Sequence, residues 1–181
     1  MRAYNWMLSR QPYGVVARLP LLHLGETRYE VLEEPLMGLD PFREQLLPEN
    51  LKAGLTRSDK IQKVMCAMLG GLPAGQVEDV ARMSCGKDIP SLLRYPIRLK
   101  NASIRDKAYK MMGDLGVSRM YPAALPGIEN IPNAVIGQEP FPCAEAWVKR
   151  LLTLPVHNGV TEQDIRVIRD VLISVHEPLS R

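Results

Sequence analysis

A capped amphipathic helix near the carboxyl end is the feature that most limits how this chain can fold. Thr161 stands where a helix N-cap belongs, and Asp164 follows three residues later, which is the spacing of a capping box. Apolar residues then recur every three or four positions, so one face of this helix needs to be buried. The pattern predicts a helix over residues 161–175 with an inward stripe formed by Ile165, Ile168, Leu172 and Val175.

Short strands and helices alternate upstream of that helix. The residues predict strands at Leu92–Leu99 and Thr153–Val156, and Pro96 favours a sheet edge or a bulge for the first of them. Ser103 is the expected cap of a helix that ends at Gly116, and a further helix is expected from Cys143 to Leu152. This alternation over residues 90–175 indicates an α+β fold in which helices cover one face of a small sheet. The inward positions expected for the helix after Ser103 are Ile104, Ala108, Met111, Met112 and Leu115.

The amino-terminal part is divided by prolines and glycines. Asp40 as N-cap and Pro41 at the first helical position predict a helix start, and a helical pattern continues from Lys60 to Leu69. Pro48 and Gly54 should kink or split this helical stretch, because an interior proline costs about 3 kcal/mol and a glycine about 1 kcal/mol. The pattern divides the chain into segments 1–38, 39–71 and 72–181. Within the last segment it predicts a short helix at Val77–Met83 and no regular structure of any length over residues 122–142.

Several short motifs, taken in order, resemble one enzyme family. The strand end Leu-Pro-Val-His, the Asn-Gly turn and the Thr-Glu-Gln-Asp-Ile cap over residues 154–165 are similar to the carboxyl end of the DegT/DnrJ/StrS sugar aminotransferases. Leu92–Leu99 resembles the first strand of their small domain, and Val117–Tyr121 resembles the return strand that faces the substrate. Residues 24–29 and 39–42 are similar to the stretch that opens their interdomain helix. The resemblance covers residues 15 to 175.

The resemblance implies a small carboxyl-terminal domain of a fold type I enzyme that depends on pyridoxal phosphate. Residues 1–38 would be the end of the large domain, and residues 39–71 a kinked interdomain helix. No segment resembles the half of these enzymes that carries the Schiff-base lysine, so we expect no covalent cofactor and no amino transfer by this chain alone. Leu36 stands where the family has an asparagine that reaches the neighbouring subunit's cofactor, and Arg43 where a glutamine is usual.

Three residues are candidates for substrate binding, and none is a catalytic candidate. The resemblance places Arg119 and Tyr121 at a strand end that lines the substrate cleft, where they could bind a carboxylate or phosphate and a sugar hydroxyl. An arginine and a tyrosine that alternate on a short strand are also a common surface pair. His157 follows the second strand, where it can serve as a turn residue as well as a ligand. Lys87 lies in a turn of small residues, but the resemblance places that turn in a variable linker.

Composition and charge exclude several classes of function. The formal net charge is +3, and the basic residues are spread along the chain, which argues against a nucleic-acid or membrane surface. The three cysteines are widely spaced and lack metal-ligand partners, which fits a reducing cytoplasm and no metal site. The amino terminus lacks the uninterrupted apolar run of a signal peptide, and Val15–Leu24 is too short to span a bilayer.

Three functions stay open on this basis. The first is part of an aminotransferase that moves an amino group from glutamate to a keto sugar. The second is a module without catalysis that binds a partner or self-associates, because the aromatic residues near the amino terminus and the face formed by Ile61, Val64 and Met68 need covering. The third is one subunit of a split enzyme whose lysine lies on another chain.

Overall fold

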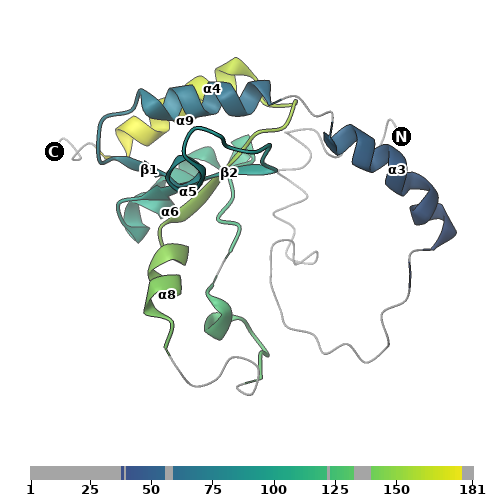
Figure 1. Cartoon of the computed structure of the whole chain (residues 1–181). Helices are drawn as coiled ribbons and strands as arrows, with labels where there is room; N and C mark the ends of the chain where they lie inside the picture. Colours follow the sequence, from purple (N-terminus) through teal and green to yellow (C-terminus); the bar gives the residue numbers. More distant parts are fainter. Residues whose placement is uncertain (1–37, 39, 56–58, 122, 133–139, 177–181) are drawn as a thin grey trace.

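The structure is a computed structural model that describes residues 38, 40–55, 59–121, 123–132 and 140–176. It is an α+β fold with a three-stranded antiparallel sheet in the order β1-β2-β3 (Figure 1). The strands are β1 (Val77–Asp79), β2 (Arg94–Leu99) and β3 (Leu151–Pro155). Segment 1–37, which includes the aromatic residues near the amino terminus and Leu36, lies outside the described residues.

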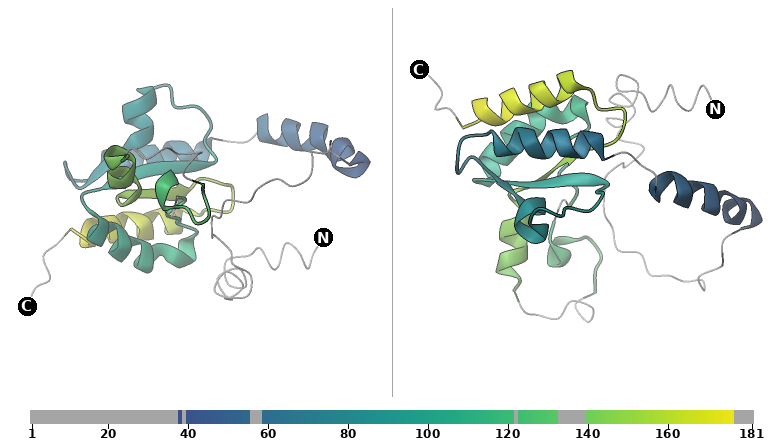
Figure 2. Two further views of the ribbon diagram at one scale, coloured as in Figure 1. Left: turned by 90° about the horizontal axis from the view of Figure 1, so that it is seen from below. Right: turned by 45° about the horizontal axis from the view of Figure 1, so that its top comes forward.

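Helices cover one face of this sheet more fully than the other. α4 (Lys60–Gly70), α6 (Ala102–Met112) and α9 (Glu162–Ser174) lie on one side and α8 (Pro142–Val148) lies on the other, while α5 (Val80–Cys85) follows β1 along the edge of β2 (Figure 2). Alternate residues of β2 show the same division, because Tyr95, Ile97 and Leu99 are fully buried while the residues between them are half-buried. The expected α+β fold, with helices packed on one face of a small sheet, is therefore confirmed, and the short helix α8 is an addition on the other face.

The capping box that opens α9 forms as the sequence predicts. The Thr161 side chain accepts a hydrogen bond from the Asp164 amide, and the Asp164 carboxylate accepts one from the Thr161 amide. All four residues of the predicted apolar stripe are buried, and they join β2, β3 and α6 in one core. The contact of α9 with both α4 and α6 makes it the central helix of its layer.

Two predictions about the sheet are wrong. Val77–Asp79 forms the strand β1, and only Val80–Cys85 is helical, so the predicted helix at Val77–Met83 begins three residues too early. β2 lies at the centre of the sheet although it contains Pro96. The proline is tolerated because β1 pairs only with residues 97–99 of β2, so β1 has ended before it reaches Pro96.

The segment after α6 also differs from the prediction. Of Val117–Tyr121 only Ser118 pairs with the sheet, through a bridge in which Ser118 and Thr153 exchange two hydrogen bonds of 2.8 and 3.0 Å. Met120 then adopts a left-handed conformation with φ of 59°, and the amide of Tyr121 bonds back to the carbonyl of Arg119. The chain turns away from β3 after one residue, so the predicted third strand does not form.

Several element boundaries are corrected as well. Asn101, not Ser103, caps α6, because its side chain accepts a hydrogen bond from the Ile104 amide. Met111 is exposed, whereas Ala108 and Met112 are buried as predicted. The element α6 continues as the short helix η2 (Gly113–Leu115), and Gly116 ends it in the left-handed conformation. The helix α8 stops at Val148, since Leu151 and Leu152 already belong to β3.

The helix predicted after Asp40 is present but stands apart from the rest of the fold. α3 (Pro41–Leu55) begins with Asp40 as its cap and continues through Pro48, so the break in the helical stretch falls after Leu55 and not at the proline. Figures 1 and 2 show α3 away from the sheet and its helices. Its large apolar side chains are exposed, namely those of Phe42, Leu46, Leu47 and Leu51.

Candidate functional site

Two of the predicted substrate-binding residues, Arg119 and Tyr121, lie just after Ser118, where the chain leaves the sheet. The Arg119 guanidinium lies over the Tyr109 ring of α6, 4.8 Å from its centroid, and 3.9 Å from the Asp106 carboxylate. These contacts pack Arg119 against α6, and its side chain is still 48% exposed. The Tyr121 side chain is exposed and projects from the turn.

His157 occupies the turn between β3 and α9. Its Nδ1 accepts a hydrogen bond from the Gly159 amide, and its carbonyl accepts one from the Val160 amide. The imidazole therefore closes the turn that leads into the capping box, as expected for a turn residue. The contacts described for Arg119 and His157 run to different elements, and substrate binding by Arg119, Tyr121 and His157 stays a prediction.

Arg94 ties the Ser118 segment to the sheet, which the sequence pattern did not reveal. Its guanidinium donates hydrogen bonds to the Thr153 hydroxyl at 2.8 Å, to the Thr153 carbonyl at 3.2 Å and to the Gly116 carbonyl. The Thr153 hydroxyl in turn donates to the Ser118 carbonyl at 3.1 Å. One planar donor thus joins β2, β3 and the turn that carries Arg119.

A second group of charges lies on the same face of the sheet. Glu78 of β1 is held between Arg98 of β2 and Arg150, which also donates to the Leu99 carbonyl. Burial alone would raise the pKa of the Glu78 carboxyl, but the two guanidinium groups outweigh it and hold this pKa below its ordinary value of 4.5. Arg98 also stacks on the ring of Trp147 in α8, 4.2 Å from its centroid. These contacts anchor the short strand β1 and the helix α8.

The lysines of the chain lie mostly at its surface. All eight lie among the described residues, and Lys107 is half-buried while the other seven, including Lys87, are exposed. A Schiff-base lysine needs an enclosed amine with an oriented cofactor. The described residues also contain no group of three histidine, cysteine, aspartate or glutamate side chains that could hold a metal ion. The cysteines at 66, 85 and 143 are free thiols.

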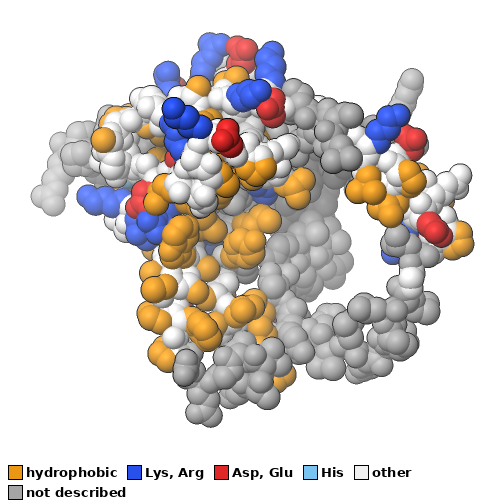
Figure 3. Space-filling model, viewed as in Figure 1, with side chains coloured by type: hydrophobic (Ala, Val, Ile, Leu, Met, Phe, Trp, Pro, Cys, Tyr) orange, Lys and Arg blue, Asp and Glu red, His pale blue; other side chains and the backbone are white. Residues whose placement is uncertain are grey.

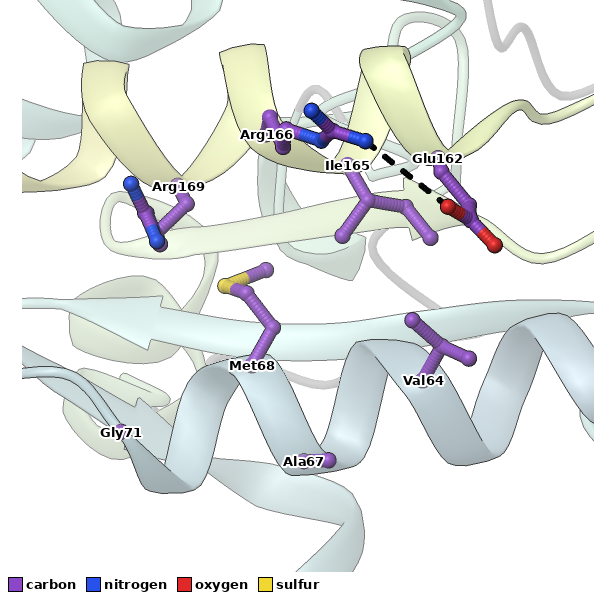
Figure 4. Close-up of a pocket in the computed structure, with 8 residues that line it drawn as sticks. All are labelled: Val64, Ala67, Met68, Gly71, Glu162, Ile165, Arg166 and Arg169. Carbon is purple, nitrogen blue, oxygen red and sulfur yellow. Dashed lines mark ion pairs between the residues drawn. The ribbon is translucent and has the colours of Figure 1, made fainter.

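One hollow lies on the opposite side of the sheet, between α4 and α9. It has a volume of about 340 Å³, and its apolar lining includes Val64, Met68 and Ile165. Figure 4 shows Val64 and Met68 rising from α4 toward Ile165 on α9. Charged side chains of α9 surround it, and Figure 3 shows charged groups gathered over this end of the molecule. No described helix is long and apolar enough to cross a membrane.

Comparison with known proteins leaves the family open. No family model matches the chain, and no curated protein matches it. Among solved structures, the aminotransferase TlmJ from Streptoalloteichus hindustanus is similar with a TM-score of 0.43 and 17% sequence identity. The match covers 74% of this chain and 34% of TlmJ, so the chain spans about a third of the length of that aminotransferase. A TM-score below 0.5 does not assign the chain to a family.

Proposed function

We propose that this chain is the carboxyl-terminal part of a DegT/DnrJ/StrS-type aminotransferase and that it does not transfer amino groups by itself. The observation that carries the proposal is the unit formed by β3, the His157 turn and the capped helix α9, which places the three motifs of the resemblance in one continuous structure. β2 and α6 precede this unit in the order that the resemblance implies. The amino donor would be glutamate and the acceptor a keto sugar.

In the completed enzyme this domain would supply substrate contacts, while another polypeptide segment supplies the lysine and the cofactor site. Arg119 would bind a carboxylate or phosphate, because its guanidinium is half-exposed beside α6. Tyr121 would bind a sugar hydroxyl from its exposed position after the turn, and His157 would contact the substrate from the turn between β3 and α9. Arg94 acts as a positioning residue in this scheme, since it holds the Ser118 turn against β3.

Borohydride reduction tests the expected lack of catalysis. The chain is incubated with pyridoxal phosphate, reduced and mapped by peptide mass spectrometry. We expect slow, unselective labelling of the exposed lysines and no amino transfer from glutamate to keto sugars. Stoichiometric labelling of a single lysine, Lys87 for instance, would show that the chain holds the cofactor alone and would overturn this part of the proposal.

Coexpression tests the assignment to an aminotransferase. The polypeptide encoded immediately upstream is produced with this chain, and the pair is assayed for bound pyridoxal phosphate and for amino transfer. Activity that requires both polypeptides would support an enzyme completed by a second segment or a split enzyme. An upstream region that encodes no lysine-bearing half, together with an inactive pair, would contradict the aminotransferase assignment.

The exposure of α3 favours a second candidate function, a module without catalysis that binds another polypeptide. Four large apolar side chains of this 15-residue helix are exposed, and a helix of this length is only marginally stable in water without packing. A protein that docks through α3 needs no lysine-bearing half at all. An inactive coexpressed pair, with α3 protected from hydrogen exchange only in a complex, would favour this module over the enzyme.

A further inference from the structure

The guanidinium of Arg119 is held against α6 by contacts that leave its hydrogen-bond donors unused. It lies over the Tyr109 ring and 3.9 Å from the Asp106 carboxylate, which is too far for a hydrogen bond. Within the part of the chain that the structure describes, this guanidinium donates no hydrogen bond. Arg94 and Arg98, by contrast, donate to hydroxyl, carbonyl or carboxylate oxygens. The planar N–H donors of Arg119 are therefore available to a ligand.

The carboxylate beside Arg119 already compensates another charge. Asp106 Oδ1 lies 2.8 Å from Nε of Arg105, whose side chain is only 9% exposed and also donates to the Val148 carbonyl at 3.2 Å. A buried guanidinium needs a counter-charge, so Asp106 serves Arg105 first. Two cations against one carboxylate leave one positive charge uncompensated, and it falls on Arg119, which is the more exposed of the two.

The ring of Tyr109 gives the Arg119 guanidinium a fixed support. Asp106 and Tyr109 are three residues apart in α6, so both side chains lie on the same face of the helix. The Tyr109 ring is half-buried and packs against the hydrophobic core, which restricts its movement. An arginine that stacks on an aromatic ring keeps its N–H donors for a carboxylate or a phosphate, whose two oxygens they can bind together.

We propose that Tyr109 is a positioning residue, which holds Arg119 ready for an anionic group of the substrate. Tyr109 does not touch the anion in this arrangement. Its ring restricts the rotamers of Arg119 before the ligand arrives, so less conformational entropy is lost on binding. The inference rests on the proposed role of Arg119 in substrate binding, and it adds the residue on which that role depends.

Anion titrations of the full chain test this inference. Inorganic phosphate and acetate are added separately at fixed ionic strength, and NMR follows the Arg119 Nε signal and the amides of residues 118–121. At least one anion should bind saturably, and Arg119→Gln should weaken it about tenfold or more. Tyr109→Leu should weaken it about two- to fivefold, whereas Tyr109→Phe keeps the ring and should bind as wild type does. Arg166→Gln removes an exposed arginine of α9 and should have no effect.

The outcomes separate this inference from the proposed function. Tyr109→Leu should also shift the Arg119 Nε signal, because the ring no longer shields it. Wild-type affinity in Tyr109→Leu, or equal losses in the leucine and phenylalanine variants, would overturn the positioning role alone. If neither anion binds, or if Arg119→Gln binds as wild type does, the substrate-binding role of Arg119 falls with it. Far-ultraviolet circular dichroism shows whether each variant keeps its fold, and no measurement requires amino transfer.

Discussion

Replacing Tyr95 with phenylalanine removes one hydroxyl from the centre of the core. The Tyr95 side chain is fully buried, and its hydroxyl lies 3.0 and 2.9 Å from the two carboxylate oxygens of Asp79. The same Asp79 carboxylate caps α5 by accepting a hydrogen bond from the Arg82 amide. Tyr95→Phe therefore leaves a carboxylate at the β1–α5 junction without its partner from β2.

The loss should be about 2 kcal/mol at pH 8, because a hydrogen bond to a charged group contributes about 1.5–3 kcal/mol. The packing of the ring is unchanged, so no cavity term is added. For a chain of this size, each kcal/mol lowers the melting temperature by about 2–4 °C. Urea denaturation followed by circular dichroism measures the difference in the free energy of unfolding between wild type and variant.

The difference should also depend on pH in a defined direction. Burial raises the pKa of the Tyr95 hydroxyl far above its ordinary value of 10.0, and the neighbouring Cys66 thiol and Asp79 carboxylate raise it further. Above pH 10 the unfolded chain loses the Tyr95 proton while the folded chain keeps it, so the wild type loses stability as the pH rises. Between pH 8 and pH 11 the advantage of wild type over Tyr95→Phe should shrink by about 1.4 kcal/mol.

Tyr121→Phe is the matched control, because it removes the same hydroxyl from a side chain that is 55% exposed. We expect it to change the free energy of unfolding by less than about 0.5 kcal/mol at pH 8. If Tyr95→Phe has the wild-type free energy of unfolding at pH 8, the hydrogen bond from the hydroxyl to Asp79 contributes nothing to stability. A constant difference from pH 8 to pH 11 would refute the raised pKa.

Two further substitutions test the polar face of the sheet. Arg94→Lys keeps the charge but loses the planar guanidinium, so it should lower the free energy of unfolding by about 1–3 kcal/mol. It should also speed hydrogen exchange at the Ser118 and Thr153 amides, which NMR can measure. Unchanged exchange at these amides would contradict the role of Arg94. Glu78→Gln should make the free energy of unfolding less dependent on pH in the acid range. The lowered pKa of Glu78 gives the wild type a stabilising contribution that is present above pH 4.5 and lost as the pH falls below it. Denaturant titrations from about pH 6 to pH 3 measure this, and an equal loss of stability in wild type and variant would contradict it.

The sequence predicted the helices and strands that have a long apolar pattern or a clear capping residue. The helix α9 has both a capping box and an apolar stripe of four residues at helical spacing, and it forms as predicted. β1 was missed because three residues are too few to show a period of two, and two of them, Glu78 and Asp79, are charged. The strand exists through tertiary contacts, since Arg98 and Arg150 hold Glu78 and the Tyr95 hydroxyl bonds Asp79.

The candidate sites show a similar limit. The exposure of Tyr121 and the turn role of His157 follow from residue type and position. The reversal at Met120 does not, because a left-handed conformation is uncommon for methionine and no glycine marks it. The hollow between α4 and α9 also has no local signal, since it forms between helices about 100 residues apart in the chain.

Pro96 makes the two ends of the sheet unequal in strength. Where β2 runs from Ile97 to Leu99 it has neighbours on both sides, but at Arg94 and Tyr95 it pairs with β3 alone. The proline has no amide hydrogen, so β1 could not be extended along this end even if the chain beyond Asp79 were straight. The backbone ladder is therefore one strand narrower at the Arg94 end, where the hydrogen bonds of the Arg94 guanidinium to Thr153 and Gly116 take the place of a third strand. Loss of the Arg94 guanidinium should therefore loosen this end of the sheet, while the end at Ile97–Leu99 keeps a strand on both sides of β2.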